Sequence, residues 1–137
     1  MIIGYTTGVF DLFHIGHLNI LKSSRSLCDK LIVGVSTDEL VNRNKNKFPV
    51  ISFKERIELV QNIKCVDLCV PQEDDDKFKA WQKIKFHKLF VGDDWHSNQK
   101  WNEYELKFKE INVEITYFPY TKGTSSTKIN NILDKFR

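Results

Sequence analysis

Apolar runs alternate with amphipathic helical patterns along the whole chain, and this alternation limits the possible folds more than any other feature of the sequence. Strands are predicted for the apolar segments 1–8, 30–36, 66–70, 88–92 and 113–118. Helices are predicted at 16–28, 52–64, 75–86, 99–110 and 126–136. Since no run of hairpins interrupts this order, we expect one α/β domain over residues 1–137, with an open parallel sheet of about five strands and helices on both faces.

Composition narrows the partners and the compartment that we expect. The 21 basic and 18 acidic side chains leave a net charge of only +3, which is too small to indicate a nucleic-acid partner. The sequence has no run of about 18 apolar residues, so no membrane span is predicted. No secretory signal is predicted before the first strand. The three cysteines have no disulfide or zinc spacing, so Cys65 and Cys69 are expected to be buried apolar thiols. We therefore expect a cytoplasmic protein with no nucleic-acid or membrane partner.

The turn after the first predicted strand is the most informative place for function, because ligands of open parallel sheets bind outside the carboxyl ends of the strands. This turn reads GVFDLFHIGH, residues 8–17, and holds two of the four histidines of the chain. His14 and His17 are three residues apart at the start of a predicted helix, so both rings can face one side. A helix N-terminus attracts phosphate, and imidazoles can donate hydrogen bonds to the negative charge of a transition state. Gly8 and Gly16 leave room for a phosphate beside the backbone.

Two other interpretations of the histidine pair have to be weighed. A metal site would need a third ligand, for which Asp94 and His96 are the obvious candidates. Packing of both rings in the core is disfavoured because they lie at a polar strand-to-helix turn. Phosphate binding is the preferred interpretation because two later motifs agree with it.

These motifs resemble those of a known family. HIGH fits the H-x-G-H pattern of the nucleotidyltransferase superfamily that is related to class I aminoacyl-tRNA synthetases, and GVFDLFHIGH resembles its cytidylyltransferase branch. GDDW at 92–95 and TKGTSSTKI at 121–129 resemble the later motifs of the glycerol-3-phosphate cytidylyltransferases. The resemblance covers essentially the whole chain. It implies a Rossmann-like nucleotidyltransferase domain that transfers CMP from CTP, with Mg²⁺ bound to the nucleotide.

The resemblance also implies an acceptor and an assembly. The first choice of acceptor is sn-glycerol 3-phosphate, which would give CDP-glycerol for wall or capsule polymers and release pyrophosphate. Choline phosphate or ethanolamine phosphate is the second choice. An adenylyltransferase like FAD synthetase and a non-catalytic nucleotide-binding module are the rivals from other classes. A homodimer is expected because residues 64–71 match the segment near the family's dimer interface, although Lys64 replaces an arginine there.

The resemblance implies a role for each of the following residues. The catalytic residues are His14, His17 and Lys47. Lys45 and Lys47 match a lysine-bearing loop after the second strand, where Lys47 is preferred as the clamp of the triphosphate. Asp94 would reach the nucleotide or its Mg²⁺, and Asp93 is equally well placed. The nucleotide-binding residues are Gly8, Val9, Phe10, His14, Gly16, His17, Lys45, Lys47, Asp94, Thr121, Lys122, Gly123, Ser125, Ser126 and Thr127. The acceptor-binding residues are Arg56, Trp95 and Tyr120.

Some of these positions have a second interpretation or depart from the family. Arg56 would bind phosphate bidentately, or it is an ordinary helix-surface arginine. Trp95 would pack on the base or the acceptor, or it closes the core. Tyr120 stands where the family has an arginine, and Lys122 is predicted to supply the missing charge. Val9 stands where the glycerol-3-phosphate enzymes have a threonine.

Two predicted helices begin with side chains that can hydrogen-bond to free backbone amides. Ser52 with Glu55 three residues later predicts a capping box. Ser125, Ser126 and Thr127 offer hydroxyl and amide groups at the start of the last helix, either as a second phosphate cradle or as plain N-caps.

Overall fold

The computed structural model describes residues 1–92, 99–119 and 126–136, and it is built on one parallel sheet. The strands are β1 (Ile3–Gly8), β2 (Lys30–Ser36), β3 (Leu68–Gln72), β4 (Lys88–Gly92) and β5 (Glu114–Phe118). Their order in the sheet is β3-β2-β1-β4-β5, and all four neighbouring pairs are parallel. The predicted open parallel sheet is therefore confirmed.

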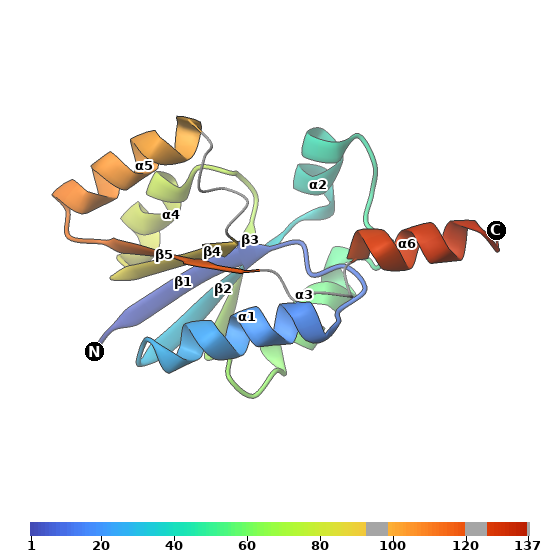
Figure 1. Ribbon diagram of the computed structural model, residues 1–137, viewed down its shortest axis with the longest axis horizontal. Coiled ribbons are helices and arrows are strands. Elements are labelled where there is room, and N and C mark those ends of the chain that lie inside the picture. The colour runs from blue at the N-terminus through green and yellow to red at the C-terminus, as the bar shows by residue number, and fades with distance from the viewer. Residues whose placement is uncertain (93–98, 120–125, 137) are drawn as a thin grey trace.

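Helices cover both faces of the sheet (Figure 1). They are α1 (Ile15–Ser26), α2 (Asp38–Lys45), α3 (Phe53–Gln61), α4 (Lys77–Ile84), α5 (Gln99–Glu110) and α6 (Ser126–Asp134). Figure 1 shows α1 and α3 on one face, α4 and α5 on the other, and α6 extending beyond the carboxyl ends of the strands. The prediction of helices on both faces is confirmed as well.

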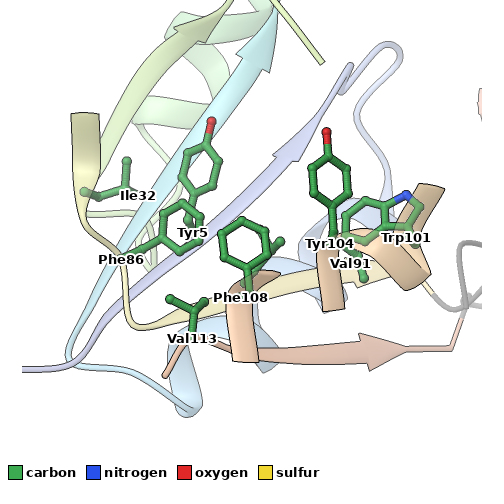
Figure 2. Close-up of a cluster of buried hydrophobic side chains, with 9 residues drawn as sticks. Tyr5, Ile32, Phe86, Val91, Trp101, Tyr104, Phe108 and Val113 are labelled. Atoms are coloured by element: carbon green, nitrogen blue, oxygen red, sulfur yellow. The ribbon is translucent and has the colours of Figure 1, made fainter. Parts of the chain in front are cut away.

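Two apolar clusters, one on each face, hold the helices on the sheet. The cluster under α4 and α5 is aromatic and includes Tyr5 and Phe86, whose rings stack with centroids 5.0 Å apart (Figure 2). The cluster under α1 and α3 contains Leu21 and Val60, both fully buried. Neighbouring residues of β4 alternate between the two clusters, because successive side chains of a strand point to opposite faces. Both faces of the central strands are thus buried, which makes the sheet a firm base for the loops at its carboxyl edge.

The helix α2 lies in a region that the sequence predicted to be a turn and a loop. Thr37 is its N-cap, with the hydroxyl accepting from the Leu40 amide at 3.2 Å, and Asp38 follows in the first turn. Carboxylates stabilise this end of a helix through its dipole. Asn46 ends the helix in the left-handed conformation that C-caps favour. The prediction missed α2 because only two of its residues are buried, so its apolar stripe is very short.

Two other local predictions were wrong for tertiary reasons. The Ser52 side chain makes no capping bond to the backbone, and its hydroxyl instead contacts the Glu55 carboxylate at 3.4 Å. The first amide of α3, at Phe53, is satisfied by the Asp38 carboxylate from α2 at 3.2 Å. The strand predicted at 66–70 lies two residues later, because β3 pairs with β2 from Leu68 onward.

The burial of the cysteines differs in part from what the sequence predicted. Cys28 is buried, but Cys65 and Cys69 are only half-buried, so the prediction of buried thiols at these two positions was wrong. Cys69 lies in β3 and Cys65 three residues before it, and in the described sheet β3 is an edge strand paired with β2. Burial nevertheless raises the pKa of the Cys69 thiol to about 11. Among the described helices, none is long and apolar enough to cross a bilayer.

Candidate active site

The site lies where the winding of the sheet changes direction. β1 is flanked by β2 and β4, so the chain leaves the sheet toward opposite sides after β1 and after β4. A crevice forms at such a switch point, at the carboxyl ends of the strands. The histidine turn, residues 9–14, connects β1 to α1 at this place. The predicted residues Asp94 and Trp95, with Asp93 and His96, follow β4 and lie outside the described residues.

The histidine turn has an unusual backbone. Phe10 and Leu12 have positive φ angles of 56° and 51°, which non-glycine residues rarely adopt. The Phe10 ring is 5 % exposed, and a Cβ at Gly8 would lie 2.9 Å from two of its carbons. Gly8 is thus required for the packing of Phe10, whatever its role toward a ligand. Strained backbone of this kind persists only where its surroundings hold it, and it is concentrated at functional sites.

His14 and His17 cap the helix α1 with their own rings. His14 is the N-cap, and its Nδ1 atom accepts the Gly16 amide at 3.0 Å. The His17 Nδ1 atom accepts the His14 amide at 3.1 Å, which completes a reciprocal capping box. The ring centroids are 3.9 Å apart. Because each Nδ1 accepts a backbone N–H, each neutral ring must hold its proton on Nε2.

The surroundings of both rings favour the neutral form. Burial lowers the pKa of His14. Burial, and then the neighbouring His14, lower the pKa of His17 to about 4, against a smaller opposing effect of the Asp11 carboxylate. Phe10 and Phe13 contribute to the apolar surroundings, with ring centroids 5.4 and 5.2 Å from that of His17. At neutral pH the pair therefore offers two Nε2–H donors and no positive charge.

We expect an NMR titration to find His17 neutral, with its proton on Nε2, from pH 8 down to about pH 5. The folded-state pKa of about 4 lies below the ordinary 6.5, so the unfolded chain binds the proton first. This histidine therefore stabilises the fold fully above pH 6.5, and its contribution falls as the pH drops from about 6.5 toward 4. A His17 pKa near 6.5, or a proton on Nδ1 in the neutral ring, would contradict the capping geometry.

A second segment is tied to the histidine turn. We call residues 46–52, which connect α2 to α3, the lysine segment. The two Asp11 carboxylate oxygens accept the amides of Val50 at 2.8 Å and Ile51 at 2.9 Å. Lys47 lies three residues before Val50, so its Cα is at most about 11 Å from that of Val50. Asp11 thus places the lysine segment beside the histidines.

The two predicted lysines differ in their local structure. Lys45 is the last residue of α2, while Lys47 lies in the lysine segment, so the predicted lysine loop is half helix. Both side chains are exposed. Within the described part of the chain, no carboxylate pairs with either ammonium group. Both charges are therefore available to an anionic ligand.

Arg56 is not the surface arginine that one interpretation of the sequence allowed. Its side chain is fully buried at the first turns of α3. Its Nη2 donates to the Asp38 carboxylate at 2.6 Å and its Nε to the Ile51 carbonyl at 2.9 Å. Its Nη1 donates to the Val9 and Ser36 carbonyls, at 2.7 Å each. The predicted bond to an acceptor phosphate stays a prediction.

The start of α6 also reaches the histidine turn. The Ser126 hydroxyl donates to the Asp11 carbonyl at 2.5 Å. Ser126 and the exposed Thr127 are thus at the edge where the nucleotide was predicted to bind. The other predicted residues of this motif lie outside the described residues: Tyr120, Thr121, Lys122, Gly123 and Ser125.

Two charged residues of this edge were not found from the sequence. Asp38 caps α3 and pairs with Arg56, which no local pattern indicated. Lys77, the first residue of α4, is only 7 % exposed, and its amide donates to the Tyr104 hydroxyl at 3.3 Å. It directly follows the acidic run at 73–76, and no sequence motif singled it out. Among the described residues, no three His, Cys, Asp or Glu side chains form a metal cluster.

Comparison with known proteins identifies the family of this chain. A family model described as cytidylyltransferase-like matches residues 5–132. The chain belongs to the cytidylyltransferase-like family. As a member of it, the protein is a nucleotidyltransferase, and the rival interpretation of a non-catalytic nucleotide-binding module is set aside.

The relatives of this nucleotidyltransferase fall into more than one substrate class. The chain is 35 % identical over 125 residues to a glycerol-3-phosphate cytidylyltransferase of Bacillus spizizenii, covering 90 % of this chain and 91 % of that protein. It is 33 % identical over 131 residues to an FAD synthase of Thermococcus sibiricus, covering 95 % and 88 %. A crystal structure of a lipopolysaccharide core biosynthesis protein from Thermoplasma volcanium superposes with a TM-score of 0.70 at 31 % identity, covering 90 % of this chain and 99 % of that one. These relatives thus have the fold and the family in common, and their names give different substrates.

Proposed function

We propose that this nucleotidyltransferase transfers a cytidylyl group from CTP to a small phosphorylated alcohol, with sn-glycerol 3-phosphate as the first choice. The histidine pair is the observation that carries the proposal, because its two Nε2–H donors stand at the switch point of the sheet. Such preorganised donors are worth most where negative charge develops in the transition state.

The reaction needs few groups from the protein. An acceptor phosphate oxygen attacks the α-phosphorus of CTP, a new P–O bond forms, and the bond to the β-phosphate oxygen breaks, so that pyrophosphate leaves. The attacking phosphate is already ionised at neutral pH, so no protein nucleophile or general base is required. Catalysis then consists of holding the two substrates in line and stabilising charge.

The neutral state of the histidines suits this role. A neutral imidazole with its proton on Nε2 donates a hydrogen bond to a phosphate oxygen and keeps that proton throughout the reaction. Lys47, and Lys45 beside it, would supply the positive charge that the triphosphate requires. Ser126 and Thr127 would contact the phosphates from the start of α6. Mg²⁺ would accompany the triphosphate, and Asp94 remains the candidate side chain to reach it.

FAD synthase activity is the second candidate, because relatives of that name match as well as the cytidylyltransferases do. It would use the same histidine turn with a different pocket for the base. The acceptor would then be FMN, which adenylyl transfer from ATP converts to FAD.

A substrate panel tests the proposal. Pyrophosphate release is measured with CTP, ATP, GTP and UTP, each combined with sn-glycerol 3-phosphate, choline phosphate, ethanolamine phosphate or FMN, with Mg²⁺ and with EDTA. We expect CTP with sn-glycerol 3-phosphate to be the best pair and EDTA to abolish the reaction. A preference for ATP with FMN would transfer the chain to the second candidate.

The proposal also includes the assembly of the protein, the use of its product and its compartment. A homodimer through residues 64–71 would present the same patch from each subunit. The product, CDP-glycerol, would serve wall or capsule polymers, and the reaction would take place in the cytoplasm.

A further inference from the structure

We propose that Arg56 is a positioning residue, which acts on nucleotidyl transfer through the lysine segment and the histidine turn and does not bind phosphate. The effect on catalysis rests on the proposed function, because it assumes that Lys47 holds the triphosphate. The geometry on which the inference depends belongs to the free protein.

The guanidinium group has too few free donors for a bidentate phosphate. An arginine side chain carries five N–H donors. Four are used within the described residues, by Ile51, Val9, Ser36 and Asp38. A bidentate phosphate contact needs two donors, so at least one of these bonds would have to break. Breaking it would leave a buried group without a partner, which is costly.

The contacts of Ile51 show how Arg56 reaches the lysine segment. The Ile51 carbonyl accepts from Arg56 Nε at 2.9 Å, and the Ile51 amide donates to Asp11 Oδ1, also at 2.9 Å. This residue is thus held from both sides by buried groups of opposite charge. Lys47 is four residues away along the same segment, so loosening Ile51 would loosen the base from which Lys47 extends.

The same guanidinium group also supports the strained turn. Its Nη1 atom donates to the carbonyl of Val9, the residue directly before Phe10, which has a positive φ angle. Its bond to the Ser36 carbonyl fixes the end of β2, from which the chain continues toward α2. One side chain therefore couples the lysine segment, which carries Lys47, to the histidine turn, which leads into α1 with the histidine pair at its start.

Hydrogen exchange of the free protein tests the structural half of the proposal. Lysine at position 56 keeps the charge but cannot reach all three carbonyls and Asp38 together. In Arg56→Lys we expect the Val50 and Ile51 amides to exchange at least about tenfold faster, while the amide of Val33 in the sheet, which reports global unfolding, changes much less. Arg25→Lys is the matched control, because Arg25 also bonds a carboxylate and a carbonyl, those of Asp67 and Cys28. Unchanged exchange at both amides in Arg56→Lys would overturn the proposal.

A double-mutant cycle tests the catalytic half. Because misplacement of catalytic groups by about 1 Å can cost about a hundredfold, we expect Arg56→Lys to lower turnover about ten- to a hundredfold. In a Lys47→Ala background the same change should cost at least about threefold less than in the wild type, since the part of the effect that acts through Lys47 is already absent and only the part through the histidine turn remains. Fully additive effects, with a raised KM for the acceptor alone, would overturn the proposal and return Arg56 to acceptor binding.

A second variant keeps the test decisive if Arg56→Lys does not fold. Asp11→Asn removes one of the two carboxylate oxygens that hold Val50 and Ile51. We expect Asp11→Asn to speed hydrogen exchange at these two amides, and its effect on turnover to be non-additive with that of Lys47→Ala. Exchange as slow as in the wild type at both amides would contradict the proposal that buried charged groups hold this segment. Because the exchange arm uses no substrate, its result stands even if the substrate panel rejects CTP or sn-glycerol 3-phosphate.

Discussion

Replacing His14 or His17 by alanine is expected to lower turnover by about two to four orders of magnitude, because each substitution removes a preorganised donor to transition-state charge. Nucleotide binding should fall much less, since the proposed contact of the triphosphate with Lys47 does not involve the histidines. Steady-state kinetics with the best pair from the substrate panel would measure both quantities. Near-normal turnover in both variants would contradict the assignment of the catalytic pair.

Asparagine at position 14 separates catalysis from helix capping. The Asn Oδ1 atom can accept the Gly16 amide in place of the imidazole Nδ1, but the side chain has no donor at the position of Nε2. His14→Ala should therefore lose about 0.5–2 kcal/mol of stability as well as turnover, while His14→Asn should lose turnover with little change in the unfolding temperature. Equal destabilisation by both substitutions would show that the ring stabilises α1 in some other way.

Lys47→Ala is expected to reduce kcat/KM for the nucleotide about ten- to a hundredfold. The loss corresponds to one charge-assisted hydrogen bond to phosphate, worth about 1.5–3 kcal/mol. Lys45→Ala should cost less, because Lys45 ends α2 and is not in the segment that Asp11 holds. Lys54→Ala, an exposed lysine in the next helix, is the matched control for net charge.

The comparison among these lysines also identifies the clamp if the preferred choice is wrong. A larger loss for Lys45→Ala than for Lys47→Ala would assign the triphosphate to the end of α2. Losses of the same small size in all three variants would mean that the lysines contribute only a diffuse positive field, which salt would screen.

Local patterns were enough for the alternation of strands and helices along the chain and for the place of the histidine pair, but not for the order of the strands in the sheet. A continuous apolar run and a shift to helical spacing are properties of neighbouring residues, so β2 and the start of α1 could be predicted from the sequence. The choice of the first turn as the candidate site rests on similar reasoning, because the carboxyl ends of parallel strands share one edge. The helix α2 was missed because its apolar stripe is too short to stand out against the loop residues around it.

The sequence by itself therefore determined the class of fold and, through the first turn, the edge and the two histidines that make up the candidate site. Only the tertiary structure decided how the lysine segment and the histidine turn are held together. The Asp11 contacts with the lysine segment join residues 39 and 40 positions apart, and the Arg56 bond to the Val9 carbonyl joins residues 47 apart. Contacts at such separations leave no periodic signal, because they depend on how α2, α3 and the histidine turn pack together. Even the position of the imidazole protons follows from three-dimensional geometry, since only the folded turn brings each Nδ1 atom to a backbone amide.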